Sequence, residues 1–319
     1  MELTFRAVDE PWPGARWRER FQASWPAYRD WYLRDGDAAR PSFAEARERL
    51  HEHVPELVPV WTRMVELAGG GDLAARMLTL YGTPPLITGC SQAALPGPVL
   101  ARNYDFHPAL FEGVIAATKF ADRRVIGMSD CLWGLLDGLN DDGLAVSLAF
   151  GGRRETGPGF AMPLIVRYLL ETCATVEAAV AALERIPVQL SYNLTLVDRQ
   201  GQAATARLAP DRPLALAPHP VAANHQGHIE WTEHATAFAS VEREQRLLEL
   251  LSEPDVDAFL EPPLLNGDYA HGFGTLYTAI HRPAGGTVEY RWPGARWVQS
   301  FDAFEEGELT VEVQPRFSV

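Results

Sequence analysis

Cys90 follows a glycine, Gly89, and lies a short way before Arg102 and Asp105. A cysteine that acts as a nucleophile needs a base to take its proton, donors to hold an oxyanion and charged groups to orient it. The arginine and the aspartate can supply the charges, and the glycine has no Cβ to block approach to its carbonyl carbon. We therefore interpret residues 81–107 as the reactive centre and expect acyl chemistry on a cysteine.

The chain contains three cysteines, Cys90, Cys131 and Cys173. An odd number without paired spacing does not indicate a disulfide framework, so we expect a reducing compartment. The chain opens without a charged stretch and apolar run of the signal-peptide kind, and it has no run of about 18 apolar residues, so we expect a cytoplasmic protein. A lone cysteine is most often a small buried hydrophobic residue, which is the competing interpretation of Cys90.

The charge of the chain limits the partners that it can bind. Asp and Glu number 42 and Lys and Arg 28, which gives a formal net charge of −14. This charge disfavours binding to nucleic acid and to anionic membranes. The apolar fraction of 47% and the charged fraction of 22% are typical of soluble globular proteins. From the cysteine chemistry we expect a small-molecule acyl amide or acyl donor as partner, and a homo-oligomer stays open.

Residues 1–80 predict helices and lack strand alternation. Aromatic residues recur at helical spacing from Trp17 to Tyr32, and Ser42 followed by Glu45 forms a capping box that predicts the start of another helix. This region is either a helical cap on the main domain or a pro-segment that ends at Gly89.

From about residue 98 the pattern changes to alternating strands with helices between them. The Asn140 to Gly143 turn indicates antiparallel neighbours, and Thr175 is a candidate helix N-cap. This order predicts an α+β fold with layered sheets and helices outside. The predicted strands are 98–106, 114–121, 123–130, 143–150, 192–197, 203–208, 275–281, 287–292 and 296–301, and the predicted helices are 163–172, 176–186 and 236–252.

Six short motifs occur in a fixed order along most of the chain: TGC (88–90), ARNYDF (101–106), NDDGLAVSLAFGG (140–152), SYNLTLVD (191–198), AANH (222–225) and SVEREQRL (240–247). Together they resemble the acyltransferase branch of the N-terminal nucleophile hydrolases, which is similar to the choloylglycine and penicillin V hydrolases. The resemblance implies a four-layer αββα sandwich and a self-catalysed cut before Cys90. It divides the chain into a helical N-terminal pro-segment, residues 1–89, and a hydrolase domain, residues 90–319.

The resemblance also implies roles for single residues. Asp105 matches the aspartate that holds the amine and thiol of the nucleophile, and Arg102 matches the arginine beside it. Asn224 matches the asparagine whose amide helps to form the oxyanion hole, and Arg243 an arginine that reaches the site from a helix. The spacing of Arg102 and Asp105 places them on opposite faces of an extended segment. As alternative interpretations, Arg102 and Asp105 form only a surface ion pair. Asn224 then only ends a strand, and Arg243 is a solvated residue.

A cut before Cys90 is chemically reasonable, because the freed α-amine titrates near about 7.7–8.0 and a thiol near about 8.5. One residue then supplies both base and nucleophile. The thiol first attacks the Gly89 carbonyl, and water hydrolyses the thioester. In turnover, an acyl-thioester on Cys90 passes its acyl group to water or to an amine. We expect Tyr104, Phe150 and Tyr192 to support the site or contact the substrate.

Two positions depart from the relatives. Ala149 stands where choloylglycine hydrolases carry an asparagine, so a backbone N–H of Phe150 or Gly151 would have to replace that donor. Arg207 stands where relatives tend to have an acidic residue.

Two other hypotheses stay open: an uncut, papain-like amidase that pairs Cys90 with His225, and an inactive binding protein, which Ala149 favours. His225, His228 and His234 form no metal-ligand motif, so we expect no metal and no cofactor.

Overall fold

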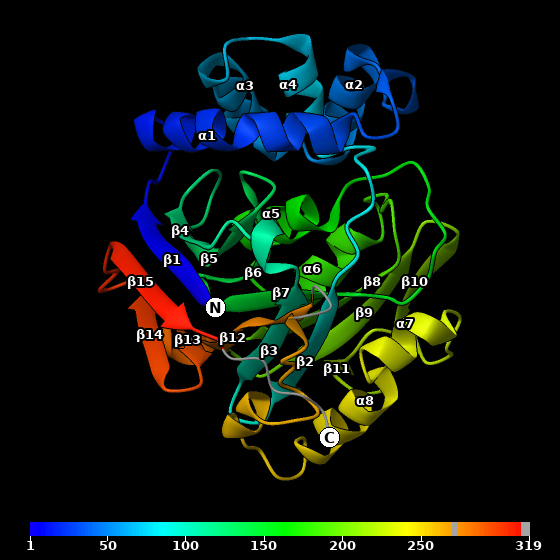
Figure 1. Ribbon diagram of the computed structural model, residues 1–319, viewed down its shortest axis with the longest axis vertical. Coiled ribbons are helices and arrows are strands. Elements are labelled where there is room, and N and C mark those ends of the chain that lie inside the picture. The colour runs from blue at the N-terminus through cyan, green and yellow to red at the C-terminus, as the bar shows by residue number, and fades with distance from the viewer. Residues whose placement is uncertain (270–272, 314–319) are drawn as a thin grey trace.

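The computed structural model describes residues 1–269 and 273–313, and two β-sheets form its centre (Figure 1). Among these residues, one sheet has the strand order β10-β9-β8-β7-β6-β5-β4-β1-β15 and the other the order β11-β2-β3-β12-β13-β14. The strands are β1 (Glu2–Asp9), β2 (Gly89–Leu95), β3 (Val99–Phe106), β4 (Val114–Thr118), β5 (Val125–Asp130), β6 (Gly134–Asn140), β7 (Leu144–Phe150), β8 (Tyr192–Asp198), β9 (Ala203–Ala209), β10 (Arg212–Leu216), β11 (Val221–Ala222), β12 (Gly274–Arg282), β13 (Thr287–Trp292), β14 (Ala295–Ser300) and β15 (Gly307–Glu312).

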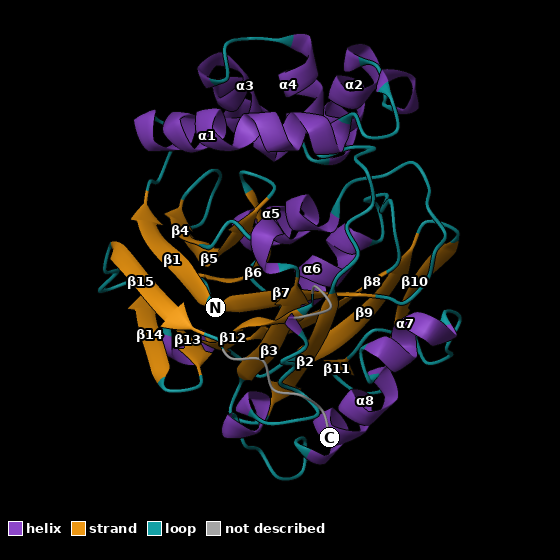
Figure 2. Cartoon of the chain, viewed as in Figure 1, coloured by secondary structure: helices purple, strands orange, loops and turns teal. Residues whose placement is uncertain are grey.

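Helices cover both outer faces of this pair of sheets (Figure 2). Strands β2 and β3 pack against β7 and β8, which joins the sheets face to face. Helices α5 and α6 pack on the larger sheet, and α8 packs on β2 and β11 of the smaller one. The predicted α+β class and four-layer αββα sandwich are confirmed. The helices are α1 (Ala15–Tyr32), α2 (Phe43–His53), α3 (Val58–Leu67), α4 (Asp72–Leu78), α5 (Met162–Thr172), α6 (Val176–Leu183), α7 (Thr232–Ala237) and α8 (Ser240–Glu249).

Local signals account for several element boundaries. The Ser42 hydroxyl accepts the Glu45 N–H at 3.2 Å and so caps α2, and Thr175 caps α6 in the same way. In the β6–β7 turn, Gly143 has a φ of 86° and the Asn140 side chain accepts the Leu144 N–H at 2.8 Å. These predicted caps and this turn are confirmed.

We predicted helices throughout residues 1–80, but the N-terminal segment also contains a strand. Residues 2–9 form β1, which lies antiparallel to β15 and parallel to β4. Leu3, Phe5 and Ala7 are buried and alternate with exposed residues, so the strand signal is present but short. Helices α1 to α4 follow and form a layer at the top of Figure 1. The N-terminal region therefore contributes a strand within the larger sheet besides its helices.

Strand β6 was also absent from the prediction. Its sequence GLLDGLN is completely buried, so it shows no alternation, and its two glycines weaken the strand signal. The glycines allow α5 to approach: a Cβ on Gly134 would lie 2.5 Å from Pro163 Cβ, and one on Gly138 would lie 2.8 Å from Leu170 Cδ1.

The predicted helix 236–252 is divided into α7 and α8. The break falls at Ala239, whose φ of 46° is left-handed. Across the described ranges, no helix has the length and apolar character needed to span a membrane.

Candidate active site

Cys90 lies in β2, opposite Tyr104 of β3, and is completely buried. Because side chains alternate along a strand, Cys90 shares one face of the smaller sheet with Tyr104 and Arg102. Arg102 Nη2 lies 3.1 Å from Cys90 Sγ and also donates to the Leu148 carbonyl of β7 at 3.3 Å. The thiol therefore faces the space between the two sheets, with one cation against it.

A network of buried polar groups holds Arg102 in place. Its Nη1 donates to Asp137 Oδ2 on β6 at 2.8 Å, and the Tyr277 hydroxyl of β12 donates to the same oxygen at 2.5 Å. His281 Nε2, also on β12, lies 3.2 Å from the other oxygen of Asp137. Burial alone would raise the pKa of Asp137, but His281, Arg102 and Tyr277 hold this pKa below its ordinary value. The carboxylate is thus the charged partner that a buried arginine requires.

Asp137, Tyr277 and His281 were missed from the sequence. A single aspartate inside the apolar run of β6 was the available signal, because a buried carboxylate needs a partner. The partners lie on a strand far away in the sequence, so only the pairing of β3 with β12 brings them together.

The ionisation of Cys90 is set by opposing influences. Burial raises the pKa of the thiol, and the charge of Asp105 adds to that rise. The Arg102 guanidinium and the Thr88 hydroxyl, whose Oγ1 lies 3.6 Å from Sγ, act to lower the pKa. Arg102 is the group that favours the thiolate most strongly.

Asp105 lies on the other face of β3, as the spacing from Arg102 predicted. Its Oδ2 is 2.6 Å from Arg243 Nη1 of α8, and its Oδ1 accepts the Thr275 hydroxyl at 2.6 Å. Arg243 has a side-chain exposure of 2% and also donates from Nε to the Pro263 carbonyl at 2.9 Å. Arg243 is therefore a buried partner of Asp105 and not a solvated partner of Glu residues on α8.

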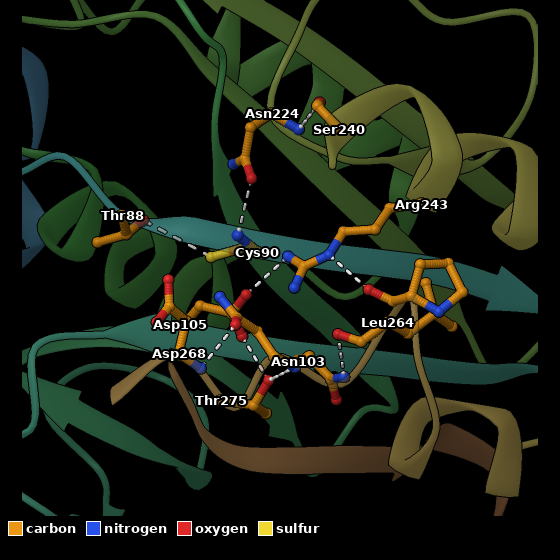
Figure 3. Close-up of polar contacts among 12 residues, drawn as sticks. Thr88, Cys90, Asn103, Asp105, Asn224, Ser240, Arg243, Leu264, Asp268 and Thr275 are labelled. Carbon is orange, nitrogen blue, oxygen red and sulfur yellow. Dashed lines mark hydrogen bonds and ion pairs between the residues drawn. The ribbon is translucent and has the colours of Figure 1, made fainter. Parts of the chain in front are cut away.

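Asn224 contacts the backbone nitrogen of Cys90 (Figure 3). Its Oδ1 accepts the Cys90 N–H at 3.0 Å, and its Nδ2 donates to the Phe150 carbonyl at 3.0 Å. The Asn224 N–H donates to Ser240 Oγ at 2.8 Å, which ties the residue to the start of α8. This amide group carries two hydrogens, and within the described residues only one of them is hydrogen-bonded.

The expected replacement donor at Gly151 is already used. The Gly151 N–H donates to the Ser191 carbonyl at 2.8 Å, so this part of the prediction is wrong. Ala149 is buried in β7 opposite Asn193 of β8, and Arg207 of β9 lies opposite the same asparagine.

An aromatic wall covers the helix side of the Gly89–Cys90 peptide. A Cβ on Gly89 would lie 2.2 Å from Phe238 Cδ1, so only glycine fits beneath that ring. His234 of α7 packs between Phe238 and Phe150, with ring centroids 4.6 and 5.0 Å away. Burial lowers the pKa of His234 to about 4. The imidazole is therefore neutral near pH 7.

The three aromatic residues expected at the site all lie close to it. The Arg102 guanidinium lies over the Tyr104 ring, 4.9 Å from its centroid. Phe150 packs edge-on against Tyr192, 6.2 Å between centroids, and the Tyr192 hydroxyl donates to the Leu86 carbonyl at 2.8 Å. Two surface hollows of about 420 and 650 Å³ lie elsewhere, and neither is lined by Cys90.

The papain-like hypothesis needs His225 beside the thiol. His225 Nδ1 instead lies 2.8 Å from Ser240 Oγ, and Nε2 lies 3.0 Å from Glu244 Oε2. Both ring nitrogens are thus engaged with α8. In the part of the chain that the structure describes, no group of three or more His, Cys, Asp and Glu side chains could hold a metal ion.

A protein-family model described as acyl-coenzyme A:6-aminopenicillanic acid acyl-transferase matches residues 94–297. The match covers more than half of the chain and begins shortly after Cys90. No curated protein matches the chain.

Several solved structures are similar to this chain at low identity. A mutant of the conjugated bile acid hydrolase from Clostridium perfringens has 11% identity and a TM-score of 0.45, covering 72% of this chain and 99% of that one. The N-acylethanolamine-hydrolyzing acid amidase ortholog from Caenorhabditis elegans has 15% identity and a TM-score of 0.44, covering 61% and 93%. Penicillin V acylase from Agrobacterium tumefaciens has 15% identity and a TM-score of 0.35, covering 67% and 78%.

Proposed function

The chain belongs to the acyl-coenzyme A:6-aminopenicillanic acid acyl-transferase family, as the resemblance of its motifs predicts, and from this premise we propose that Cys90 is the nucleophile of a self-cleaving amide hydrolase or acyltransferase. One observation carries the proposal: the two reactive atoms of Cys90 have separate partners. Sγ lies 3.1 Å from Arg102 Nη2, and the backbone nitrogen donates to Asn224 Oδ1 at 3.0 Å. A cation at the sulfur favours the thiolate, and an acceptor at the nitrogen orients the atom that becomes the α-amine.

Self-cleavage begins when Cys90 Sγ forms a bond to the Gly89 carbonyl carbon. The tetrahedral intermediate then breaks its bond to the Cys90 nitrogen, which takes up a proton and becomes a free amine. Water hydrolyses the resulting thioester, leaving a carboxylate on Gly89 and a free thiol on Cys90. A glycine before the cysteine favours this step, because its Cβ-free backbone fits under Phe238.

Turnover repeats the same attack on an external amide. The α-amine of Cys90 takes the thiol proton and passes it to the leaving amine, while the second hydrogen of the Asn224 amide is directed at the oxyanion. Asp105 lies opposite Gly89 in the β2–β3 pair and forms an ion pair with Arg243. From this position the two residues orient the new N-terminus. Water then releases the acyl group as an acid, or an amine accepts it.

Intact-mass measurement of the freshly expressed protein tests the proposal. We expect two fragments that divide between Gly89 and Cys90, and N-terminal sequencing should read Cys-Ser-Gln from the larger one. Cys90→Ala should stay whole and inactive. Cys131→Ala and Cys173→Ala are the matched controls, and both should be cut as in the parent.

An active preparation that contains only the full-length chain would overturn the proposal. If His225→Ala then abolished activity while the chain stayed whole, the papain-like hypothesis would replace it. A whole chain without activity toward acyl amides would favour the inactive binding protein.

A further inference from the structure

Residues 84–89 lie beside Cys90 and are held by few polar contacts. Pro84 and Pro85 have no N–H, and among the described residues one hydrogen bond reaches a carbonyl of residues 84–88, from the Tyr192 hydroxyl to Leu86 O at 2.8 Å. Just before this segment the chain is anchored more firmly. The Gly82 N–H donates to the Gly159 carbonyl at 2.9 Å, and Thr83 is hydrogen-bonded to the Gln189 side chain.

This segment is the acyl part of the first amide that Cys90 attacks, if the proposed function holds. Once Sγ has replaced the Cys90 nitrogen, the acyl group of the thioester is the peptide that ends at Gly89. The position of residues 86–89 therefore shows the direction in which the acyl chain of a thioester extends away from the sulfur. External acyl groups must use the same direction, because the thiol, Arg102 and Asn224 are the same in both reactions.

The Tyr192 hydroxyl is a hydrogen-bond donor that lies beside residues 86–89. Its ring is buried and packs on Phe150, whose carbonyl accepts from the same Asn224 that binds the Cys90 nitrogen. When residues 84–89 leave after the cut, the Tyr192 hydroxyl loses its Leu86 acceptor, while its ring stays packed on Phe150. An acyl group that returns a carbonyl to this point restores the hydrogen bond, and the modest net gain of that bond favours such a group.

We propose that Tyr192 selects peptide-like acyl groups, by donating to a carbonyl that lies three residues before the scissile carbonyl. The Leu86 and Gly89 carbonyls are separated by that length of chain, about 10 Å when extended. The preferred substrates are amides of short N-acylated peptides, in preference to plain hydrocarbon acyl amides of the same length. Tyr192 is a specificity-determining residue and takes no part in bond making.

Two anilides test the proposal on the cut protein. In acetyl-isoleucyl-threonyl-glycyl anilide the acetyl carbonyl takes the position of the Leu86 carbonyl, and a straight-chain acyl anilide of equal length lacks it. We expect the parent to have a kcat/KM about tenfold higher for the peptide anilide. Tyr192→Phe should lose this preference by lowering only the peptide value. Tyr32→Phe is the matched control, a buried tyrosine on α1 whose hydroxyl has no hydrogen-bond partner among the described residues, and it should keep the preference.

The proposal is overturned if the parent prefers the straight-chain anilide, or if Tyr192→Phe lowers both values equally. The first of these outcomes can be read from the parent alone, even where the variant does not fold. A failure of the proposed function looks different: the chain stays whole, or Cys90→Ala still hydrolyses both anilides. A cut, Cys90-dependent enzyme that ignores the acetyl carbonyl defeats only the role of Tyr192.

Discussion

The two faces of the β2–β3 strand pair surround Cys90 with different kinds of structure. On the face between the sheets, Arg102 meets Asp137 and Tyr277, and all of these residues come from strands. On the helix face, Asp105 meets Arg243 of α8, under aromatic rings from α7 and its C-terminal end. The first face contacts the sulfur, and the second lies on the Gly89 side. Strand alternation thus places the cation that contacts the thiol and the Asp105–Arg243 ion pair on opposite faces of β3.

The largest effect is expected on the inner face, from Arg102→Gln. Asp137 would then be buried without its cation. We expect the free energy of unfolding to fall by an amount near the upper end of about 3–5 kcal/mol. Because Arg102 lowers the pKa of Cys90, its loss should also move the pH midpoint of Cys90 alkylation upward. Urea unfolding and peptide mass spectrometry after iodoacetamide treatment measure the two effects.

The double variant Arg102→Gln with Asp137→Asn should recover much of that stability, because it removes both charges. Arg18→Gln, on an exposed position of α1, is the control and should change stability by less than about 0.5 kcal/mol. If the alkylation midpoint does not move, Arg102 does not govern the thiol.

Asp105→Asn should shift the same midpoint in the opposite direction. The Asp105 charge raises the pKa of Cys90, so its removal lowers the pKa and moves the alkylation midpoint downward. Arg243 loses its ion pair but keeps the Pro263 carbonyl, so we expect a loss near the lower end of about 3–5 kcal/mol. Both midpoints are compared with the parent in the same state of cleavage. A shift of the same sign in Asp105→Asn and Arg102→Gln would remove the distinction between the faces.

A smaller loss of stability is expected at acidic pH, from protonation of His234 on the helix face. His234 has its pKa lowered from 6.5 to about 4 by burial, so protonation favours the unfolded chain. The stability of the neutral form is present above pH 6.5 and is lost as the pH falls toward 4. We expect a loss of about 2–3 kcal/mol over this range.

Denaturant unfolding at several pH values measures this loss, with His234→Leu as the variant that should lack it. His51→Gln, at an exposed position of α2, should behave as the parent. Equal pH profiles for His234→Leu and the parent would assign the acid sensitivity to other groups.

The sequence was informative where a local pattern determines the structure. The caps at Ser42 and Thr175 and the opposite faces of Arg102 and Asp105 depend on neighbouring residues alone, and all agree with the structure. The four layers and the set of site residues came instead from ordered motifs. Cys90, Arg102, Asn224, Asp105 and Arg243 do lie together, although their roles stay predictions.

What the sequence did not predict depends on burial and on distant pairing. Strand β6 is buried on both faces and rich in glycine, so it lacks the period of two that identifies a strand, and Asp137 was lost with it. His281 gains meaning only through the register of β3 with β12. In β1 the alternation was present but too short to stand out from the helical pattern that follows it.

Strand β1 lies between β4 and β15 in the larger sheet, far along the chain from the Gly89–Cys90 bond. If that bond is cut, the sheet consists of two polypeptides, and the shorter one supplies an interior strand. Refolding from denaturant then becomes a second-order reaction that slows on dilution, and the melting temperature rises with protein concentration. A chain kept whole by Cys90→Ala would refold at a rate independent of concentration.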